Sequence, residues 1–191
     1  MWITLFKLSQ FLIISIFVVS ISDFRKKTGM VPLINERITI FIKFSYFIPI
    51  TIFAYTIATM DYLTPFDFMG SALTFVGTVV IAKAKLDLGI CHTWAGYCKQ
   101  SSKLEVSGIY AYIRHPPYLG VHLFSIGGLV ILTFHAQLYL TMVAVTMGFF
   151  MILFLTFTAS KETDYLTKKL GNNFIRYRDQ VHPFLPLKKY S

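Results

Sequence analysis

The side chains that could do chemistry are concentrated in residues 108–120, which read GIYAYIRHPPYLG. Arg114 and His115 stand directly before two prolines, Pro116 and Pro117, and an apolar segment begins at Tyr118. The first turn of a helix has unpaired N–H groups and the positive end of the dipole, so a cationic pair there suits a carboxylate or a phosphate. Proline fits this turn and makes the entrance rigid. The alternative is an interfacial anchor, with arginine on lipid phosphate and tyrosines in an aromatic belt.

Two carboxylates and a histidine are further candidates. Glu162 and Asp164 follow the last apolar segment, where they either balance a basic tail or accept hydrogen bonds from a ribose diol. His122, one turn beyond Tyr118, is a functional candidate because ionisable residues inside membranes are costly, although a packed structural histidine fits equally well. Four aromatic residues either form the interfacial belt or enclose an adenine ring or a sulfonium cation: Trp94, Tyr110, Tyr112 and Tyr118.

Composition assigns these residues to a membrane protein. The chain is 55% hydrophobic and only 14% charged, with a mean hydropathy of +0.61. Its net charge is +9, but the basic residues stand in short segments between apolar runs. That distribution indicates contact with anionic membrane lipids and control of topology, and it argues against a nucleic-acid partner.

Metal and dinucleotide sites of the common kinds are not indicated. Cys91 and Cys98 are too few and wrongly spaced for a disulfide framework, and Cys91 with His92 has no recognised zinc spacing. We therefore expect no metal. The glycines of residues 108–128 lack the strand–helix context of a dinucleotide fingerprint.

Five apolar segments predict an all-α, polytopic membrane bundle of about five transmembrane helices in one domain, residues 1–191. The first three helices fall in residues 1–84. Pro49 is expected to kink the second, and a small-residue face should pack the third. Residues 85–114 form the longest polar stretch and are expected to be a loop. The five segments lie at about residues 2–21, 38–60, 66–84, 116–133 and 137–158.

Basic residues predict the orientation. They occur in the first and third connections and in the tail, whereas residues 61–65 and 134–136 contain no Lys or Arg. The N-terminus is therefore expected outside and the C-terminus in the cytoplasm, which brings residues 108–120 and the tail to the same side. In the tail, apolar residues at helical spacing around residues 171–173 predict two short helices, followed by an extended end. The absence of an organelle signal favours a bacterial inner membrane.

The run Gly-x-Tyr-x-x-x-Arg-His-Pro-x-Tyr-x-Gly resembles the signature of the integral-membrane methyltransferases, which include isoprenylcysteine carboxyl methyltransferases and their phospholipid-methyltransferase relatives. The second half of the chain, about residues 85–190, also resembles theirs. The matching tail positions are Glu162, Leu166, Gly171, Phe174, Tyr177 and Pro183 or Pro186.

This resemblance implies S-adenosylmethionine as methyl donor and a lipophilic acceptor, such as a prenylcysteine carboxylate. It implies that Glu162 takes the ribose, and it leaves Arg114 and His115 as candidate catalytic residues. Departures are Ser102 and Glu105 near the motif, Thr158 where the family has an arginine for the acceptor, and Thr163 where a second glutamate is common. The implied cofactor-binding residues are Lys103, Leu104, Tyr110, His115, Pro116, Pro117, Tyr118 and Glu162.

Two other functions are compatible with these features. Membrane sterol and steroid reductases share a similar Arg-His-Pro run and bind NADPH, although they often have tryptophan at the position of Phe174. A non-catalytic accessory protein that kept the fold and lost the acceptor arginine would explain Thr158.

Overall fold

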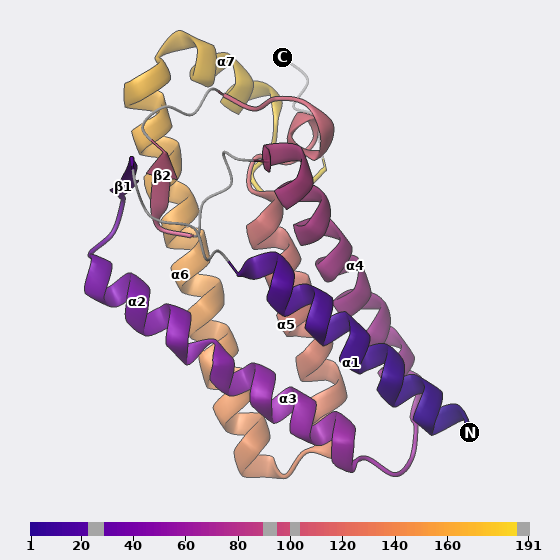
Figure 1. Ribbon diagram of the computed structural model, residues 1–191. Coiled ribbons are helices and arrows are strands. Elements are labelled where there is room, and N and C mark those ends of the chain that lie inside the picture. Colours follow the sequence, from indigo (N-terminus) through magenta and orange to yellow (C-terminus); the bar gives the residue numbers. More distant parts are fainter. Residues whose placement is uncertain (23–28, 90–94, 100–103, 187–191) are drawn as a thin grey trace.

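Five membrane-spanning segments, each long and apolar enough to cross a bilayer, make up most of the chain that the structure describes. The computed structural model describes residues 1–22, 29–89, 95–99 and 104–186. The predicted all-α membrane bundle is thereby confirmed, and Figure 1 shows its arrangement. The spans are α1 (Trp2–Ile21), the broken pair α2 (Glu36–Ser45) and α3 (Phe47–Thr59), α4 (Pro65–Leu88), α5 (Pro116–His135) and α6 (Leu138–Leu170).

The second span is interrupted in the turn that precedes Pro49, the residue predicted to kink it. The break falls at Tyr46, which separates α2 from α3. Pro49 lies inside the first turn of α3, where its missing N–H breaks no helical hydrogen bond. Asn35 caps α2 by accepting a hydrogen bond from the backbone N–H of Arg37 at 2.9 Å.

Helices α4 and α5 pack closely through glycines. A Cβ added at Gly70 would lie 2.7 Å from the carbonyl oxygen of Gly127, and one added at Gly77 would lie 2.5 Å from that of Gly120. Only backbones in direct contact produce such distances, as expected for small-residue packing of membrane helices. The predicted packing face of the third helix is confirmed at Gly70 and Gly77, and α5 supplies matching glycines at the same spacing.

Polar contacts attach α1 to α4. Gln10 is fully buried and donates to the Ser71 hydroxyl at 2.6 Å. At the other end of α1, the Lys85 ammonium donates to the carbonyl oxygens of Val19 and Ser22, both at 2.9 Å. A cation at the C-terminal end of a helix satisfies its free carbonyls and opposes the negative end of its dipole.

The last span continues into the predicted tail. The sequence predicted a span ending near residue 158 and a separate short helix, but α6 runs unbroken from Leu138 to Leu170. Residues 160–170 contain no glycine or proline, and Gly171 ends α6 with a φ of 56° that favours glycine. Only the second predicted tail helix is separate, as α7 (Asn172–Gln180). Glu162 consequently stands on a rigid helix.

The connections at one end of the bundle are more ordered than predicted. Strands β1 (Met30–Pro32) and β2 (Tyr97–Lys99) form an antiparallel pair, which the sequence did not predict. Helix α4 extends to Leu88 into the predicted loop, and a 3₁₀ turn, η2 (Gly108–Ala111), precedes α5. Figure 1 places β1, β2 and α7 at the same end. This end carries the motif of residues 108–120.

Candidate functional site

The entrance to α5 is fixed from both sides. Pro116 and Pro117 open the helix, and Pro116 is completely buried. The C-terminal segment pairs with the residues just before it, because the N–H groups of Arg114 and His115 donate to the carbonyl oxygens of His182 and Pro183, each at 3.0 Å. Pro116 and Pro117 have no backbone N–H, so the donors come from the two residues before them. The two bonds hold His115 and the first turn of α5 rigidly.

His115 and Tyr118 converge on the carboxylate of Glu162 from α6. The Tyr118 hydroxyl donates to Oε2 of Glu162 at 3.2 Å, and Nδ1 of His115 lies 3.4 Å from the same oxygen. The two rings lie nearly parallel, with centroids 5.6 Å apart. The His115 side chain is only 6% exposed, whereas that of Glu162 is 24% exposed. One oxygen of Glu162 is thus engaged, while no described residue donates to the other.

The second ring nitrogen of His115 also faces an oxygen. Nε2 lies 3.3 Å from the Thr163 hydroxyl, and that hydroxyl donates its own hydrogen bond to the carbonyl of Ala159 at 2.8 Å. The hydroxyl oxygen therefore acts as an acceptor toward His115.

Arg114 points toward the C-terminal segment and not into this cluster. Its Nε donates to the carbonyl of Val181 at 2.9 Å, and its Nη1 is buried without a partner among the described residues. Burial is the main reason that the pKa of Arg114 is lowered, and nearby Arg178 lowers it further. The unsatisfied nitrogen still has a hydrogen-bond donor to offer an anionic partner.

The remaining motif residues join the loop to α7. Tyr110 is buried, and its carbonyl accepts from the Tyr177 hydroxyl at 2.7 Å. Burial raises the pKa of both phenols well above the usual range. Leu104 packs against Phe174 and Tyr177. The structure thus brings His115, Tyr118 and Glu162 together, while Tyr110, Arg114 and Leu104 form an adjoining shell. Lys103 lies outside the described residues.

Two contributors were not recognised in the sequence. The Phe184 ring lies 6.0 Å from that of His115 and 5.6 Å from that of His122. Its only local signal is an aromatic residue between two prolines. Thr163 was noted only as a departure from the family pattern, yet its hydroxyl contacts His115.

The other predicted candidates lie apart from the cluster or outside the described residues. Tyr112 is exposed. Thr158 is fully buried and donates to the carbonyl of Phe154 at 2.8 Å. Cys91, His92 and Trp94 lie outside the described residues. In the described part of the chain, no group of three or more His, Cys, Asp or Glu could hold a metal ion.

Comparison with known proteins places these residues in a family context. The sequence model of the phospholipid methyltransferase family matches residues 66–172, a segment that includes α5, the preceding motif and Glu162. A Protein-S-isoprenylcysteine O-methyltransferase of Schizosaccharomyces pombe is 29% identical over 123 residues, covering 61% of this chain and 49% of that protein. The chain therefore spans about half the length of this curated relative. With more than half of the chain matched, this protein belongs to the phospholipid methyltransferase family.

Proposed function

We propose that this protein is an S-adenosylmethionine-dependent methyltransferase that acts on a lipophilic acceptor at the membrane. The observation that carries the proposal is the Glu162 carboxylate, which His115 and Tyr118 hold at the entrance of α5 with one oxygen unengaged. The family match spans all three residues.

The residues present fit this cofactor. The unengaged oxygen of Glu162 suits a ribose hydroxyl, as acids do in nucleotide sites. The stacked rings of His115 and Tyr118, with Phe184 beside them, offer flat faces to an adenine or a sulfonium. Nη1 of Arg114 lacks a partner in the described structure, which suits a carboxylate. When bound, the cofactor supplies an electrophilic methyl group on a positively charged sulfur.

The chain's own contribution is then binding and orientation. Methyl transfer requires an aligned acceptor and exclusion of water more than it requires a catalytic triad. Pro116 and Pro117 fix the entrance, while Leu104 and Tyr110 support it through α7; Lys103 is assigned to the site by family resemblance alone. Arg114 and His115, the candidate catalytic residues, are proposed here as residues that hold the donor.

The orientation proposed from the basic residues gives the two substrates separate routes. With the N-terminus outside and the C-terminus cytoplasmic, the polar donor reaches the α5 entrance from the cytoplasm. A lipophilic acceptor reaches the site from the bilayer, between helices. The printed name of the Schizosaccharomyces pombe relative specifies isoprenylcysteine, but Thr158 of this chain supplies no charge to pair with such a carboxylate.

Calorimetric titration of the detergent-purified protein tests the proposal. S-adenosylhomocysteine, the product form of the donor, is expected to bind, and NADPH is not. Binding of NADPH without a response to S-adenosylhomocysteine would instead assign the protein to the membrane reductases. A lack of response to both would favour a non-catalytic accessory protein.

A further inference from the structure

The C-terminal segment, residues 181–186, returns to the entrance of α5, where Phe184 lies beside the ring of His115. The first part of the segment is anchored by the backbone, because two N–H groups before α5 donate to the carbonyl oxygens of His182 and Pro183 at 3.0 Å. The structure describes no backbone–backbone hydrogen bond beyond Pro183 in this segment. The position of Phe184 therefore depends on another support.

The side chain of His182 supplies this support. Its Nδ1 accepts hydrogen bonds from the backbone N–H groups of Phe184 at 3.3 Å and Leu185 at 3.1 Å. Pro183 follows His182 and has its φ fixed near about −65°, which suits the second residue of a tight turn. A side-chain acceptor at the first residue stabilises such a turn, as the side chains of Asn and Asp commonly do. His182 thus closes the turn that presents Phe184.

The two bonds require one protonation state of the His182 ring. A ring nitrogen that accepts from two N–H groups carries no proton, so the ring is neutral with its proton on Nε2. A further proton on Nδ1 would place a third donor against the other two and open the turn. The side chain is half-buried, so protons from solvent reach it. Since histidine is the side chain that ordinarily changes its charge between about pH 5 and pH 8, the turn is sensitive to pH.

Phe184 connects this turn to the proposed donor site. Its ring centroid lies 6.0 Å from that of His115 and 5.6 Å from that of His122. His115 in turn stacks on Tyr118 and lies 3.4 Å from the carboxylate of Glu162. An open turn would remove one aromatic neighbour of His115 and one flat face of the donor site.

We propose that His182 is a positioning residue for the methyl donor: its neutral ring closes the turn that sets Phe184 against His115, and its protonation opens that turn. This inference rests on the proposed methyltransferase function. The form that binds the donor contains the neutral ring. The affinity for the donor is therefore full at weakly basic pH, and it falls as the pH drops through the range in which His182 gains a proton.

Other groups around the segment also respond to pH. They are the same in every variant of His182, as is the ligand, so their contributions cancel when variants are compared at the same pH. The described charged and titratable groups that contact the segment or its neighbours are Tyr110, Arg114 and His115 before α5, Tyr118 and His122 on α5, Glu162 on α6, and Tyr177, Arg178 and Asp179 on α7.

Three substitutions of His182 in the purified full chain test the inference by calorimetric titration with S-adenosylhomocysteine. His182→Asn keeps an acceptor at the position of Nδ1, one bond beyond Cγ, but does not titrate. His182→Leu removes the acceptor, and His182→Gln carries its acceptor one bond farther out. At about pH 8, the Asn variant should bind as the wild type does and the other two about tenfold more weakly. Between about pH 8 and pH 5.5, the wild type should lose about tenfold more affinity than His182→Asn.

Two further measurements separate positioning through Phe184 from a general structural effect. Phe184→Ala should weaken binding, and adding His182→Leu to it should cost no further affinity, because the turn then has no ring to place. Hydrogen exchange follows the turn without any donor. At about pH 8 the amides of Phe184 and Leu185 should be protected in the wild type and in His182→Asn, and unprotected in His182→Leu.

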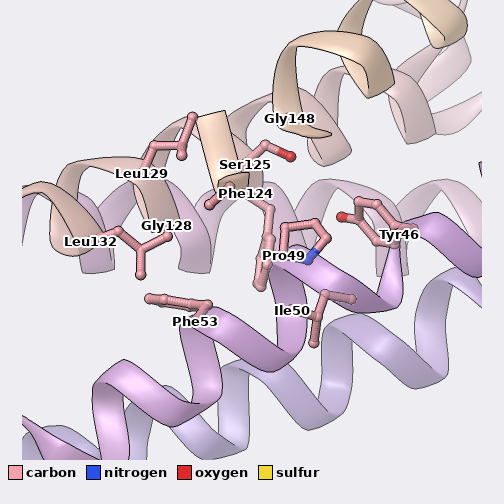
Figure 2. A pocket seen from close by; sticks show the side chains of 11 residues that line it. Tyr46, Pro49, Ile50, Phe53, Phe124, Ser125, Gly128, Leu129, Leu132 and Gly148 are labelled. Carbon is pink, nitrogen blue, oxygen red and sulfur yellow. The ribbon is translucent and has the colours of Figure 1, made fainter. Parts of the chain in front are cut away.

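A cavity between α3, α5 and α6 offers a control position on α5 (Figure 2). Tyr46 and Ser125 line it together with apolar side chains, whereas His122 and Phe184 are not among its lining residues. Ser125→Ala should therefore leave both the affinity for S-adenosylhomocysteine and its pH dependence as in the wild type.

The inference and the proposed function fail differently. If the wild type does not bind S-adenosylhomocysteine, the proposed function is overturned, and the positioning role of His182 falls with it. If the wild type binds, the inference alone is overturned by wild-type affinity in His182→Leu at about pH 8, or by wild-type pH dependence in His182→Asn. An equal change of pH dependence in Ser125→Ala, or unprotected amides of Phe184 and Leu185 in the wild type, would also overturn it.

Discussion

Two histidine–carboxylate pairs occupy opposite ends of α5, and they differ in how completely their carboxylates are engaged. At the C-terminal end, His135 and Asp67 are 1% and 0% exposed, and both carboxylate oxygens lie 2.9 Å from Nε2. Asp67 also accepts from the backbone and hydroxyl of Thr64 as part of a capping box. At the N-terminal end, His115 and Glu162 lie 3.4 Å apart, with the glutamate 24% exposed.

The difference distinguishes a pair whose carboxylate is fully engaged from the pair that we propose binds a ligand. The Asp67 carboxylate has partners for both oxygens, and the Tyr62 ring lies 4.6 Å from that of His135, so neither carboxylate oxygen is left for a ligand. Nδ1 of His135 is buried without a partner among the described residues. Glu162 has partners for one oxygen only and faces a partly open space. A histidine with a carboxylate thus fastens α4 to α5 at one end and leaves a carboxylate oxygen without a described donor at the other.

The largest expected effect comes from breaking the pair formed by His135 and Asp67. Asp67→Ala leaves His135 buried without its carboxylate partner and removes the cap of α4. We expect a loss of about 3–5 kcal/mol in the free energy of unfolding, as for other broken buried pairs. Denaturant titration in detergent measures it. Asp61→Ala, at an exposed aspartate in the connection before α4, is the control, and equal stability of the two variants would refute the structural role of the pair.

The contact between α4 and α5 lies between the two pairs, and widening it should affect both. Gly77→Ala places a Cβ 2.5 Å from the carbonyl oxygen of Gly120, which no side-chain rotation can relieve. We expect a loss of about 1–3 kcal/mol of stability from overpacking. Gly148→Ala, where the nearest described atom is 3.6 Å away, is the matched control in the same unfolding assay. Stability equal to that of the control would show that α4 and α5 separate freely.

Removing the charge of Glu162, in the pair formed by His115 and Glu162, should weaken binding of the donor without comparable loss of protein stability. Glu162→Gln preserves shape but removes the charge that faces the His115 ring and the donor. We expect affinity for S-adenosylhomocysteine to fall by about tenfold or more, since hydrogen bonds to charged groups are the stronger kind. Stability should change by less than about 1 kcal/mol, because the carboxylate is partly exposed. Asp164→Asn, two residues along α6, should bind S-adenosylhomocysteine as the wild type does. Equal binding by both variants would show that the donor site lies elsewhere.

Hydropathy was sufficient to predict the five spans, because a bilayer requires long apolar helices and few other signals compete with that one. It could not locate the end of α6. Polarity changes near Ser160, but the helix continues until Gly171, since leaving the membrane does not require a helix to stop. The proline predicted an interruption of the second span, and the break at Tyr46 falls in the turn before Pro49, where a proline ring disturbs a helix.

The motif predicted several residues that meet at the entrance of α5, but not the contacts that each makes. His115, Tyr118 and Glu162 meet, as expected from the prediction that the entrance of α5 and the tail lie on one side of the membrane. Phe184 was missed because its contact depends on how the C-terminal segment returns to α5, which no local pattern encodes. The cavity beside Ser125 arises from a gap among three helices and has no sequence signal.

The smallest expected effect tests whether the Thr163 hydroxyl orients His115 in its pair with Glu162. Thr163→Val keeps the shape of the side chain but removes the oxygen that faces Nε2 of His115, so this ring nitrogen loses its acceptor. A net hydrogen bond contributes about 0.5–1.5 kcal/mol, so affinity for S-adenosylhomocysteine should fall by roughly two- to tenfold. Thr167→Val is the matched control, since its hydroxyl also bonds to a carbonyl of the preceding turn but does not contact His115. If both valine variants bind S-adenosylhomocysteine equally well, the hydroxyl of Thr163 does not orient His115. The contacts of the ring with Glu162 and Tyr118 then suffice to orient it.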